Sequence, residues 1–352
     1  MKPKLINKIK IKNWLNDLSK DFTIVAPIKN GDNFDFHIIE DINDIAFDFD
    51  RTRMSAKSFF FIPEEELWVA SMTNGSPLST EPEPDLKVIF GLRPCDISAL
   101  TLFDDVFSKD YNDPYFSRQR EQNITIGLRC LEQCKTGFCG TMNSYNPMKG
   151  YDIMLTELPN TNYLVEIGSI KGKNITDFEY FTSPTNTDET IIKIAFQKID
   201  ETFKDDIGIV GIRTIMDLDI PQDMLDKYGE VCLSCGQCSF VCPTCWCFNI
   251  KDEFKLDSSD IGNLDNIKRT RSWTSCLYKE FHSISGAPPH VFKKTNSSRI
   301  EAYYKHKLRG VSEKYGVLGC VGCGRCFQSC PVGINPKATI ETIMESKNNG
   351  ND

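Results

Sequence analysis

The sequence predicts an α+β protein with an N-terminal α/β domain over residues 1–215 and a mainly helical domain over residues 216–352. Apolar, strand-like runs alternate with helical segments in the first part, and such runs become rare after about residue 220. About eighty residues also separate two cysteine-rich runs in the second part, which favours helices packed between them. A chain of 352 residues exceeds one typical domain, and this length supports the division.

Hydrophobic periodicity and turn residues predict the individual elements. Helices are expected over residues 6–20, 96–108, 187–203 and 335–347. Strands are expected over residues 22–27, 35–39, 58–62, 86–91, 123–127 and 163–167. We expect strands 86–91 and 123–127 to pair in parallel. The acidic, proline-bearing segment 80–85 is predicted to be a surface loop, and residues 204–220 are predicted to hold the domain boundary.

The second domain contains a duplicated cysteine run. The two copies are Cys232-Leu-Ser-Cys235-Gly-Gln-Cys238-Ser-Phe-Val-Cys242-Pro243 and Cys320-Val-Gly-Cys323-Gly-Arg-Cys326-Phe-Gln-Ser-Cys330-Pro331. Both follow the spacing C-x2-C-x2-C-x3-C-P, with which bacterial ferredoxins hold [4Fe-4S] cubanes, the fourth cysteine of each run ligating the other run's cluster. The spacing therefore predicts two clusters, one on Cys232, Cys235, Cys238 and Cys330, and one on Cys320, Cys323, Cys326 and Cys242.

Structural zinc and disulfides are the alternatives for these eight cysteines. Zinc sites usually present cysteines as separated pairs, and a third cysteine followed by x3-Cys-Pro has no role in them. Disulfides need an oxidising compartment, and nothing in the sequence indicates export. Both alternatives fit the duplicated run less well than two cubanes.

The first domain holds four further cysteines. Cys95 follows strand 86–91 and Cys130 follows strand 123–127, so both emerge at the same sheet edge if these strands are neighbours. Cys134 and Cys139 lie on the loop that continues from Cys130. A third iron–sulfur cluster on Cys95, Cys130, Cys134 and Cys139 is one interpretation, and zinc or buried unligated cysteines are the others.

Three cysteines remain outside these sets. Cys245 and Cys247 come directly after the first run in Cys-Pro-Thr-Cys-Trp-Cys, and Cys276 stands in Ser-Trp-Thr-Ser-Cys. A redox dithiol, a further metal site completed by Cys276, and packing beside the clusters are three open interpretations.

Composition narrows the class of protein. The N-terminus is positively charged without an apolar segment behind it, which argues against a signal peptide. No apolar run approaches the length that crosses a bilayer, so a cytoplasmic protein without membrane contact is expected. A net charge of −8 argues against nucleic acid as a partner, and no phosphate-binding glycine motif is present. The four histidines form no spaced ligand set.

Motifs spread from about residue 50 to 335 carry a resemblance to a known family. They include Arg51-Thr-Arg-Met, Lys57-Ser-Phe-Phe-Phe, Arg93-Pro-Cys95-Asp96-Ile, Asp113-Pro-Tyr-Phe, Phe138-Cys139, Cys242-Pro-Thr-Cys245-Trp-Cys247, Trp273-Thr-Ser-Cys276 and Cys320-Val-Gly-Cys323-Gly-Arg-Cys326. With these the chain resembles the iron–sulfur beta subunits of cytosolic sulfhydrogenase-type [NiFe] hydrogenases and the A subunits of anaerobic sulfite reductase. The Cys-Pro-Thr-Cys-x-Cys continuation and the Pro-Cys-Asp element make the match specific.

The resemblance implies a non-catalytic electron-transfer subunit of a hetero-oligomeric, anaerobic oxidoreductase complex. Its expected partners are a flavin-containing reductase subunit that handles NAD(P)H and a catalytic subunit that holds [NiFe] or sirohaem. The expected cofactors are two [4Fe-4S] clusters and a third on the first domain. A thiol–disulfide or heterodisulfide-type redox enzyme using Cys245 and Cys247, and a redox-sensing module, are the alternative functions.

Overall fold

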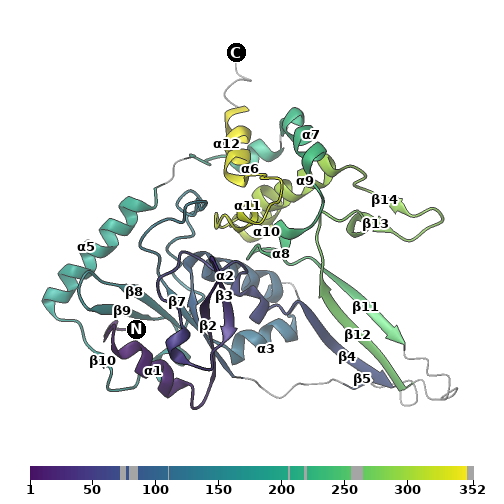
Figure 1. Cartoon of the computed structure of the whole chain (residues 1–352). Helices are drawn as coiled ribbons and strands as arrows, with labels where there is room; N and C mark the ends of the chain where they lie inside the picture. Colours follow the sequence, from purple (N-terminus) through teal and green to yellow (C-terminus); the bar gives the residue numbers. More distant parts are fainter. Residues whose placement is uncertain are drawn as a thin grey trace.

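The computed structural model describes residues 1–71, 77–78, 86–109, 111–204, 207–217, 220–254 and 265–346. An eight-stranded mixed sheet forms the centre of the N-terminal part, and a helical region with the duplicated cysteine run lies beside it (Figure 1). The sheet has the order β10-β1-β9-β8-β7-β6-β2-β3. Its strands are β1 (Lys4–Asn7), β2 (Thr23–Asn30), β3 (Asn33–Ile38), β6 (Lys87–Leu92), β7 (Ile124–Leu128), β8 (Ile153–Glu157), β9 (Asn162–Ile167) and β10 (Phe181–Thr182).

The four central strands β2, β6, β7 and β8 are parallel, and the outer pairings are antiparallel. Their side chains alternate between two cores, as the period of two in a strand requires. On β6, Val88 and Phe90 face the core that α1 (Lys10–Leu18) covers, whereas Ile89 faces the core under α2 (Pro94–Ser108) and α3 (Pro114–Gln122). The sheet is therefore buried on both faces, which suits its near-continuous apolar strands.

The carboxyl end of β6 bends at Gly91. This glycine has a φ of +85°, and the pairing of β6 with β7 shifts register between Phe90 and Leu92. A bulge of this kind changes the direction of the strand. The chain then continues through Arg93 directly into α2, which begins at Pro94. Proline has no backbone N–H, and an N–H at the first helical position would have no partner within the helix. Pro94 is therefore well suited to begin α2, which carries Cys95 in its first turn.

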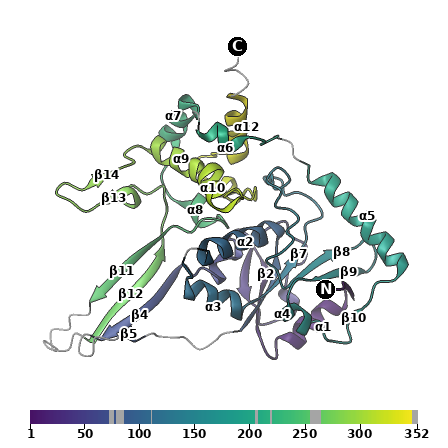
Figure 2. The ribbon, with the colours of Figure 1, turned by 180° about the vertical axis from the view of Figure 1, so that it is seen from behind.

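A second sheet joins the two parts of the chain. It has the order β11-β12-β4-β5 and is antiparallel throughout. Its strands are β4 (Glu64–Ser71), β5 (Pro77–Leu78), β11 (Phe248–Phe254) and β12 (Asp265–Trp273). Figures 1 and 2 show this sheet extending away from the large sheet as a long arm. Because β4 precedes residue 215 and β12 follows it, the arm ties the two predicted domains together.

Helices and short turns complete the fold. On the N-terminal part these are η1 (Ile42–Asp44), η2 (Ala56–Phe59), α4 (Ile170–Asn174) and α5 (Asn186–Thr202). Around the cysteine runs lie α6 (Ile212–Asp217), α7 (Gln222–Val231), α8 (Gln237–Phe240), η3 (Glu280–His282), β13 (Ser283–Ile284), β14 (His290–Val291), α9 (Asn296–Lys305), the π-helical turn η4 (His306–Gly310), α10 (Val311–Tyr315), α11 (Arg325–Gln328) and α12 (Pro336–Ser346). No helix among the described residues combines the length and the apolar character that a membrane span needs.

Most expected elements are present. The helices at 96–108, 187–203 and 335–347 correspond to α2, α5 and α12, and the parallel pairing of strands 86–91 and 123–127 is that of β6 with β7. The expected loop 80–85 lies outside the described residues. The boundary near residue 215 stays a prediction.

Three expectations differ from the structure. Residues 4–7 form strand β1, so the first helix begins only at Lys10. The predicted strand 58–62 is wrong, because η2 turns the chain there so that Phe60 and Phe61 both enter the core under α2. The mainly helical second domain is not confirmed, because the amphipathic segments β11 and β12 form a long hairpin within it.

Candidate iron–sulfur sites

The two cysteine runs fold alike. Each makes a left-handed turn between its first and second cysteines, at Ser234 (φ 50°) and Gly322 (φ 62°), and a second one before a single-turn helix. The second turns are Gly236 (φ 75°) before α8 and Gly324 (φ 71°) before α11. These turns curl the backbone so that successive thiols face one space, and glycine adopts such φ values without strain.

Backbone N–H groups donate hydrogen bonds to cysteine sulfur atoms in both runs. The N–H of Ser234 donates to Cys232 Sγ, that of Gly322 to Cys320 Sγ, and that of Ile334 to Cys330 Sγ, each at 3.4 Å. Hydrogen bonds to sulfur stabilise thiolate and help to set the potential of a cluster bound to it.

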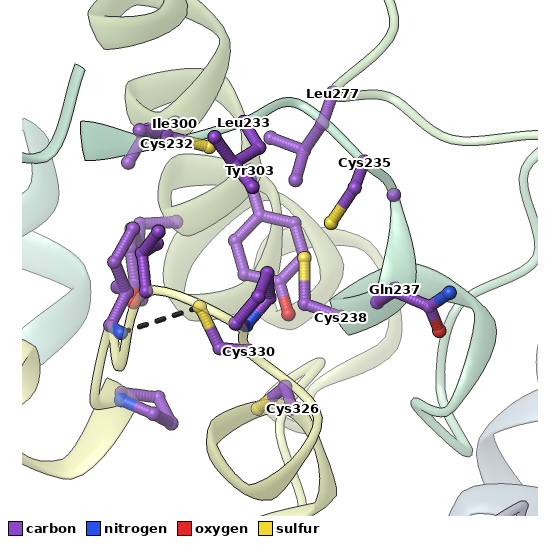
Figure 3. Close-up of a pocket in the computed structure, with 16 residues that line it drawn as sticks. Cys232, Leu233, Cys235, Gln237, Cys238, Leu277, Ile300, Tyr303, Cys326 and Cys330 are labelled. Carbon is purple, nitrogen blue, oxygen red and sulfur yellow. Dashed lines mark hydrogen bonds between the residues drawn. The ribbon is translucent and has the colours of Figure 1, made fainter. Parts of the chain in front are cut away.

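The first predicted ligand set surrounds one apolar cavity. Cys232, Cys235, Cys238 and Cys330 all line it, together with the buried rings of Tyr303 and Tyr304. Figure 3 shows the four sulfur atoms arranged around the same space, with Cys326 at its far side. The fourth thiol comes from the second run, as the crossed pattern predicts.

The second predicted set lines a neighbouring cavity. Cys242, Cys320, Cys323 and Cys326 lie on its wall with Phe138 and Leu308. Cys242 comes here from the first run, so the exchange of fourth cysteines is reciprocal. Cys326 borders both cavities, and the two sites therefore adjoin.

The chemistry of these donor sets fits cubanes. All fifteen cysteines are free thiols, so no disulfide competes for them. In the described part of the chain no group of three or more His, Cys, Asp and Glu side chains is placed to hold a metal ion directly, and the thiols of each set are spread around a cavity instead. A cubane binds each of its four thiolates through a different iron atom. Thiols spread around a cavity therefore suit a cubane better than a single metal ion.

The four cysteines of the first domain also come together. A small cavity between the carboxyl edge of the large sheet and the second run is lined by Cys95, Cys130, Cys134 and Cys139. Cys323 of the second run also lines this cavity. Cys95 and Cys130 follow neighbouring parallel strands, as expected. Burial raises the pKa of Cys130 to about 11, although Arg93 nearby favours its thiolate.

Arg93 occupies the wall between this cavity and a larger one. Its side chain is only 6% exposed, stacks over Phe49 at 3.8 Å, and donates to the Leu128 carbonyl, but its Nε has no partner among the described residues. An unpartnered buried donor next to four thiols suits an acceptor such as cluster sulfide. The larger cavity, of about 660 Å³, is polar and has Cys130 and Cys134 on its wall.

A buried lysine faces the second site. The Lys307 ammonium donates to Cys242 Sγ at 3.3 Å, Thr244 Oγ1 at 2.7 Å and the Gly319 carbonyl at 2.9 Å. Burial opposes its charge, but the thiolates of Cys242, Cys245 and Cys320 outweigh burial and raise the pKa of Lys307 well above its ordinary value. The lysine thus keeps its positive charge beside a predicted cluster ligand.

Two of the remaining three cysteines, Cys245 and Cys247, lie near a second buried lysine. The neighbouring Cys242 thiol raises the pKa of Cys245, and the neighbouring Cys276 thiol lowers the pKa of Cys247. Lys57 donates to the carbonyls of Ser239 and Cys245 and lies 4.2 Å from the centre of the Trp273 ring. Burial lowers the pKa of Lys57 to about 8. The structure thus pairs each cysteine of the Cys-Trp-Cys segment with a different thiol.

Polar contacts attach the first domain to the second cysteine run. Arg325, 1% exposed, makes two hydrogen bonds of 2.9 and 2.8 Å to the Asp96 carboxylate, and Arg51 donates to the Cys323 carbonyl at 2.6 Å. The Phe138 N–H donates to the Gly322 carbonyl at 2.7 Å. These bonds fix the third cavity against the second one.

Sequence reasoning singled out the cysteines but missed several residues that surround them. Arg51, Lys57, Arg93 and Asp96 appeared only within motifs, and Lys307 was not singled out. A lysine inside an aromatic stretch, as in Lys57-Ser-Phe-Phe-Phe, is the one sequence signal that indicates a buried charge.

Comparison with known proteins agrees with this geometry. The family described as "4Fe-4S dicluster domain" matches residues 231–334, which include both cysteine runs. The protein "Sulfhydrogenase 2 subunit beta" of Pyrococcus furiosus is 28% identical over 337 residues, which cover 94% of this chain and 95% of that protein. No solved structure matches the chain. The chain is therefore similar along almost its whole length to a sulfhydrogenase beta subunit and carries a 4Fe-4S dicluster domain, in agreement with the predicted resemblance.

Proposed function

We propose that this chain is an iron–sulfur electron-transfer subunit that relays single electrons within an oxidoreductase complex. The observation that carries the proposal is the contiguity of the thiol-lined cavities. Cys326 borders the first and second cavities, and Cys323 borders the second and third. Clusters held there would be near neighbours, and each [4Fe-4S] cluster supplies one-electron redox chemistry when bound.

The protein supplies the environment of this relay. The buried rings of Tyr303 and Tyr304 line the first site, and Lys307 places a positive charge against the second. Thiolate ligands, N–H donors and burial are the features through which a protein sets cluster potentials. On this proposal the ligand sets are the two crossed sets of the duplicated run, and the four first-domain cysteines hold a third cluster.

The proposed partners follow from the relatives. A protein similar to a hydrogenase beta subunit is expected to work beside a catalytic subunit and beside a flavin-containing reductase subunit that handles NAD(P)H. A hydrogenase catalytic subunit is favoured by the relative's name, for which the resemblance implies [NiFe], and a sirohaem partner is the alternative. We propose a cytoplasmic hetero-oligomer without nucleic acid or membrane as partners. The identity of the genes beside this one distinguishes the two catalytic partners.

Iron and acid-labile sulfide analysis of anaerobically prepared protein tests the cofactor content. About twelve iron atoms per chain support three cubanes, and about eight refute the third. Cys139→Ala is then expected to lower the iron content by about four atoms per chain. Cys245→Ala is the matched control, since Cys245 belongs to no predicted ligand set, and it is expected to retain full iron.

Reconstitution with a flavoprotein partner tests the relay. The chain alone is expected to oxidise no NAD(P)H, whereas the complex is expected to reduce the cubanes on addition of NAD(P)H, as followed by low-temperature electron paramagnetic resonance (EPR). Cys238→Ser removes a ligand of the first site and is expected to interrupt electron delivery to the catalytic subunit. NAD(P)H oxidation by the isolated chain, or undiminished delivery in this variant, refutes the relay.

A thiol–disulfide enzyme that uses Cys245 and Cys247 is the second candidate, and it stays a prediction. The effect of Cys276 on the pKa of Cys247, and that of Cys242 on the pKa of Cys245, favour Cys276 as the partner of Cys247 in such an enzyme. Loss of turnover in Cys247→Ser with both cubanes intact would favour this candidate over the relay.

A further inference from the structure

Cys247 and Cys276 form a thiol pair outside all predicted ligand sets. Cys247 directly precedes β11 and Cys276 follows β12, and the antiparallel ladder aligns Phe248 with Trp273 beside them. The ladder continues past the strand ends, because the Thr274 N–H donates to the Cys247 carbonyl at 3.0 Å. A paired β framework therefore holds the two cysteines against each other.

The two cysteines are close enough to affect each other's ionisation. The thiol and the backbone N–H of Cys276 both favour the Cys247 thiolate and lower the pKa of Cys247. A disulfide needs an S–S distance of about 2.05 Å and a suitable dihedral angle, which two neighbouring thiols reach by side-chain rotation. Both cysteines are half-buried, so protons released on closure have access to water.

The pair adjoins the first predicted cluster. Each neighbour of Cys276 contacts that site: Ser275 Oγ lies 2.9 Å from Ser239 Oγ, next to Cys238, and Leu277 lines the cavity itself. Tyr278 Oη donates to the Cys235 carbonyl at 3.3 Å. The segment that carries Cys276 thus packs against the first site.

We propose that Cys247 and Cys276 are a redox-active dithiol that exchanges two electrons with the adjacent cubanes by closing to a disulfide and reopening. This inference rests on the proposed function, because the cubanes are its electron acceptors and donors. Its role is that of a two-electron store on a one-electron relay.

The redox step balances within the chain. Both thiols lose their protons to water, one S–S bond forms, and the two electrons pass singly to two oxidised cubanes, each of which becomes reduced by one electron. In the reverse step two reduced cubanes return the electrons, the S–S bond breaks, and two protons are taken up. No further oxidant or reductant is needed beyond those that charge the relay itself.

Nearby charge favours the reactive form of the pair. Thiolate is the species that forms disulfides, and cationic neighbours favour it. Hydrogen bonding from Cys276 lowers the pKa of Cys247 to about 7 despite burial, and the ammonium groups of Lys307 and Lys57 act in the same direction. Cys276 keeps its proton and serves as the donor in this contact.

Redox titration of the intact, cluster-loaded chain with thiol trapping tests the proposal. Anaerobic protein is poised with mediators at a series of potentials, quenched in acid, alkylated with iodoacetamide and digested. Mass spectrometry is expected to find Cys247 cross-linked to Cys276 at oxidising potentials and both cysteines alkylated at reducing ones. Coulometric reduction is expected to require about two electrons more per chain in the wild type than in Cys276→Ser.

Two comparisons make the outcome specific. Cys245→Ser is the matched control and is expected to retain the Cys247–Cys276 cross-link, whereas a cross-link between Cys245 and Cys247 in the wild type overturns the proposal. Two alkylated cysteines at every potential, with cubanes intact and oxidised, also overturn it. Iron analysis and EPR on the same samples separate this result from failure of the relay, in which the cubanes themselves are missing. A cross-link that forms without any cubane refutes the proposed exchange.

Discussion

Replacing Lys307 by methionine tests whether its buried charge sets the potential of the cluster at the second site. The Lys307 ammonium lies 3.3 Å from Cys242 Sγ, and reduction of a cluster behind that sulfur adds one negative charge about 5 to 6 Å away. With an effective dielectric constant of about 20, the lost attraction is about 3 kcal/mol. Because a cation stabilises the more negative, reduced state, the variant's potential is expected to fall by about 130 mV, at about 59 mV for each tenfold change in a one-electron equilibrium.

EPR-monitored potentiometry of the anaerobic protein measures this shift. Lys307→Gln retains a hydrogen-bond donor without the charge and is expected to show most of the fall, which separates electrostatics from hydrogen bonding. Lys305→Met removes a half-exposed lysine paired with Glu301 on the same helix and is the matched control, with no expected change. An unchanged or higher potential in Lys307→Met at full iron content would refute the reasoning.

Four further outcomes are expected. Cys330→Ser should remove the cluster of the first run, about four iron atoms per chain, although it lies in the second run; retention of that cluster by EPR would contradict the crossed arrangement. Asp96→Ala leaves the buried Arg325 without its carboxylate partner and should cost about 3–5 kcal/mol in urea unfolding, whereas Asp252→Ala in the exposed pair with Arg269 should change the free energy of unfolding far less. Gly324→Ala places a Cβ 2.1 Å from the Thr136 carbonyl oxygen and should destabilise the protein more than Gly333→Ala, which has a similar positive φ in open space and should cost about 1 kcal/mol in the same assay. The lowered pKa of Cys247 means that its thiolate fraction rises with pH to one half at about pH 7, so its rate of alkylation by iodoacetamide should reach half its maximum there, and in Cys276→Ser only at higher pH.

The sequence predicted features that local spacing determines. The cysteine runs, α2 after its proline and the parallel strands β6 and β7 all depend on residues close together in the chain, and each is where the pattern indicated. Cys330 lines the cavity of the first run, where the spacing of the motif places it, and its role as a cluster ligand stays a prediction.

What the sequence did not reveal depends on contacts between distant residues. β4 pairs with β12 although about two hundred residues separate them in the sequence, and nothing in either segment identifies the other as its pairing strand. The segment 58–62 has strand composition, but tertiary packing of Phe60 and Phe61 decides its conformation. The burial of Lys57 and Lys307, and the contact of Cys247 with Cys276 rather than Cys245, likewise follow only from the assembled fold.

The reciprocal exchange of cysteines between the two runs has a consequence for biosynthesis. The space lined by Cys232, Cys235 and Cys238 lacks its fourth thiol until residue 330 has left the ribosome, and the neighbouring space depends in turn on Cys242. Domains generally fold in the order of synthesis, so the large sheet is complete long before either space is. Delivery of inorganic iron and sulfide to the first space then has to wait for a nearly finished polypeptide. Truncation between residues 326 and 330 leaves this space alone without its fourth thiol, whereas truncation before residue 326 leaves both spaces incomplete.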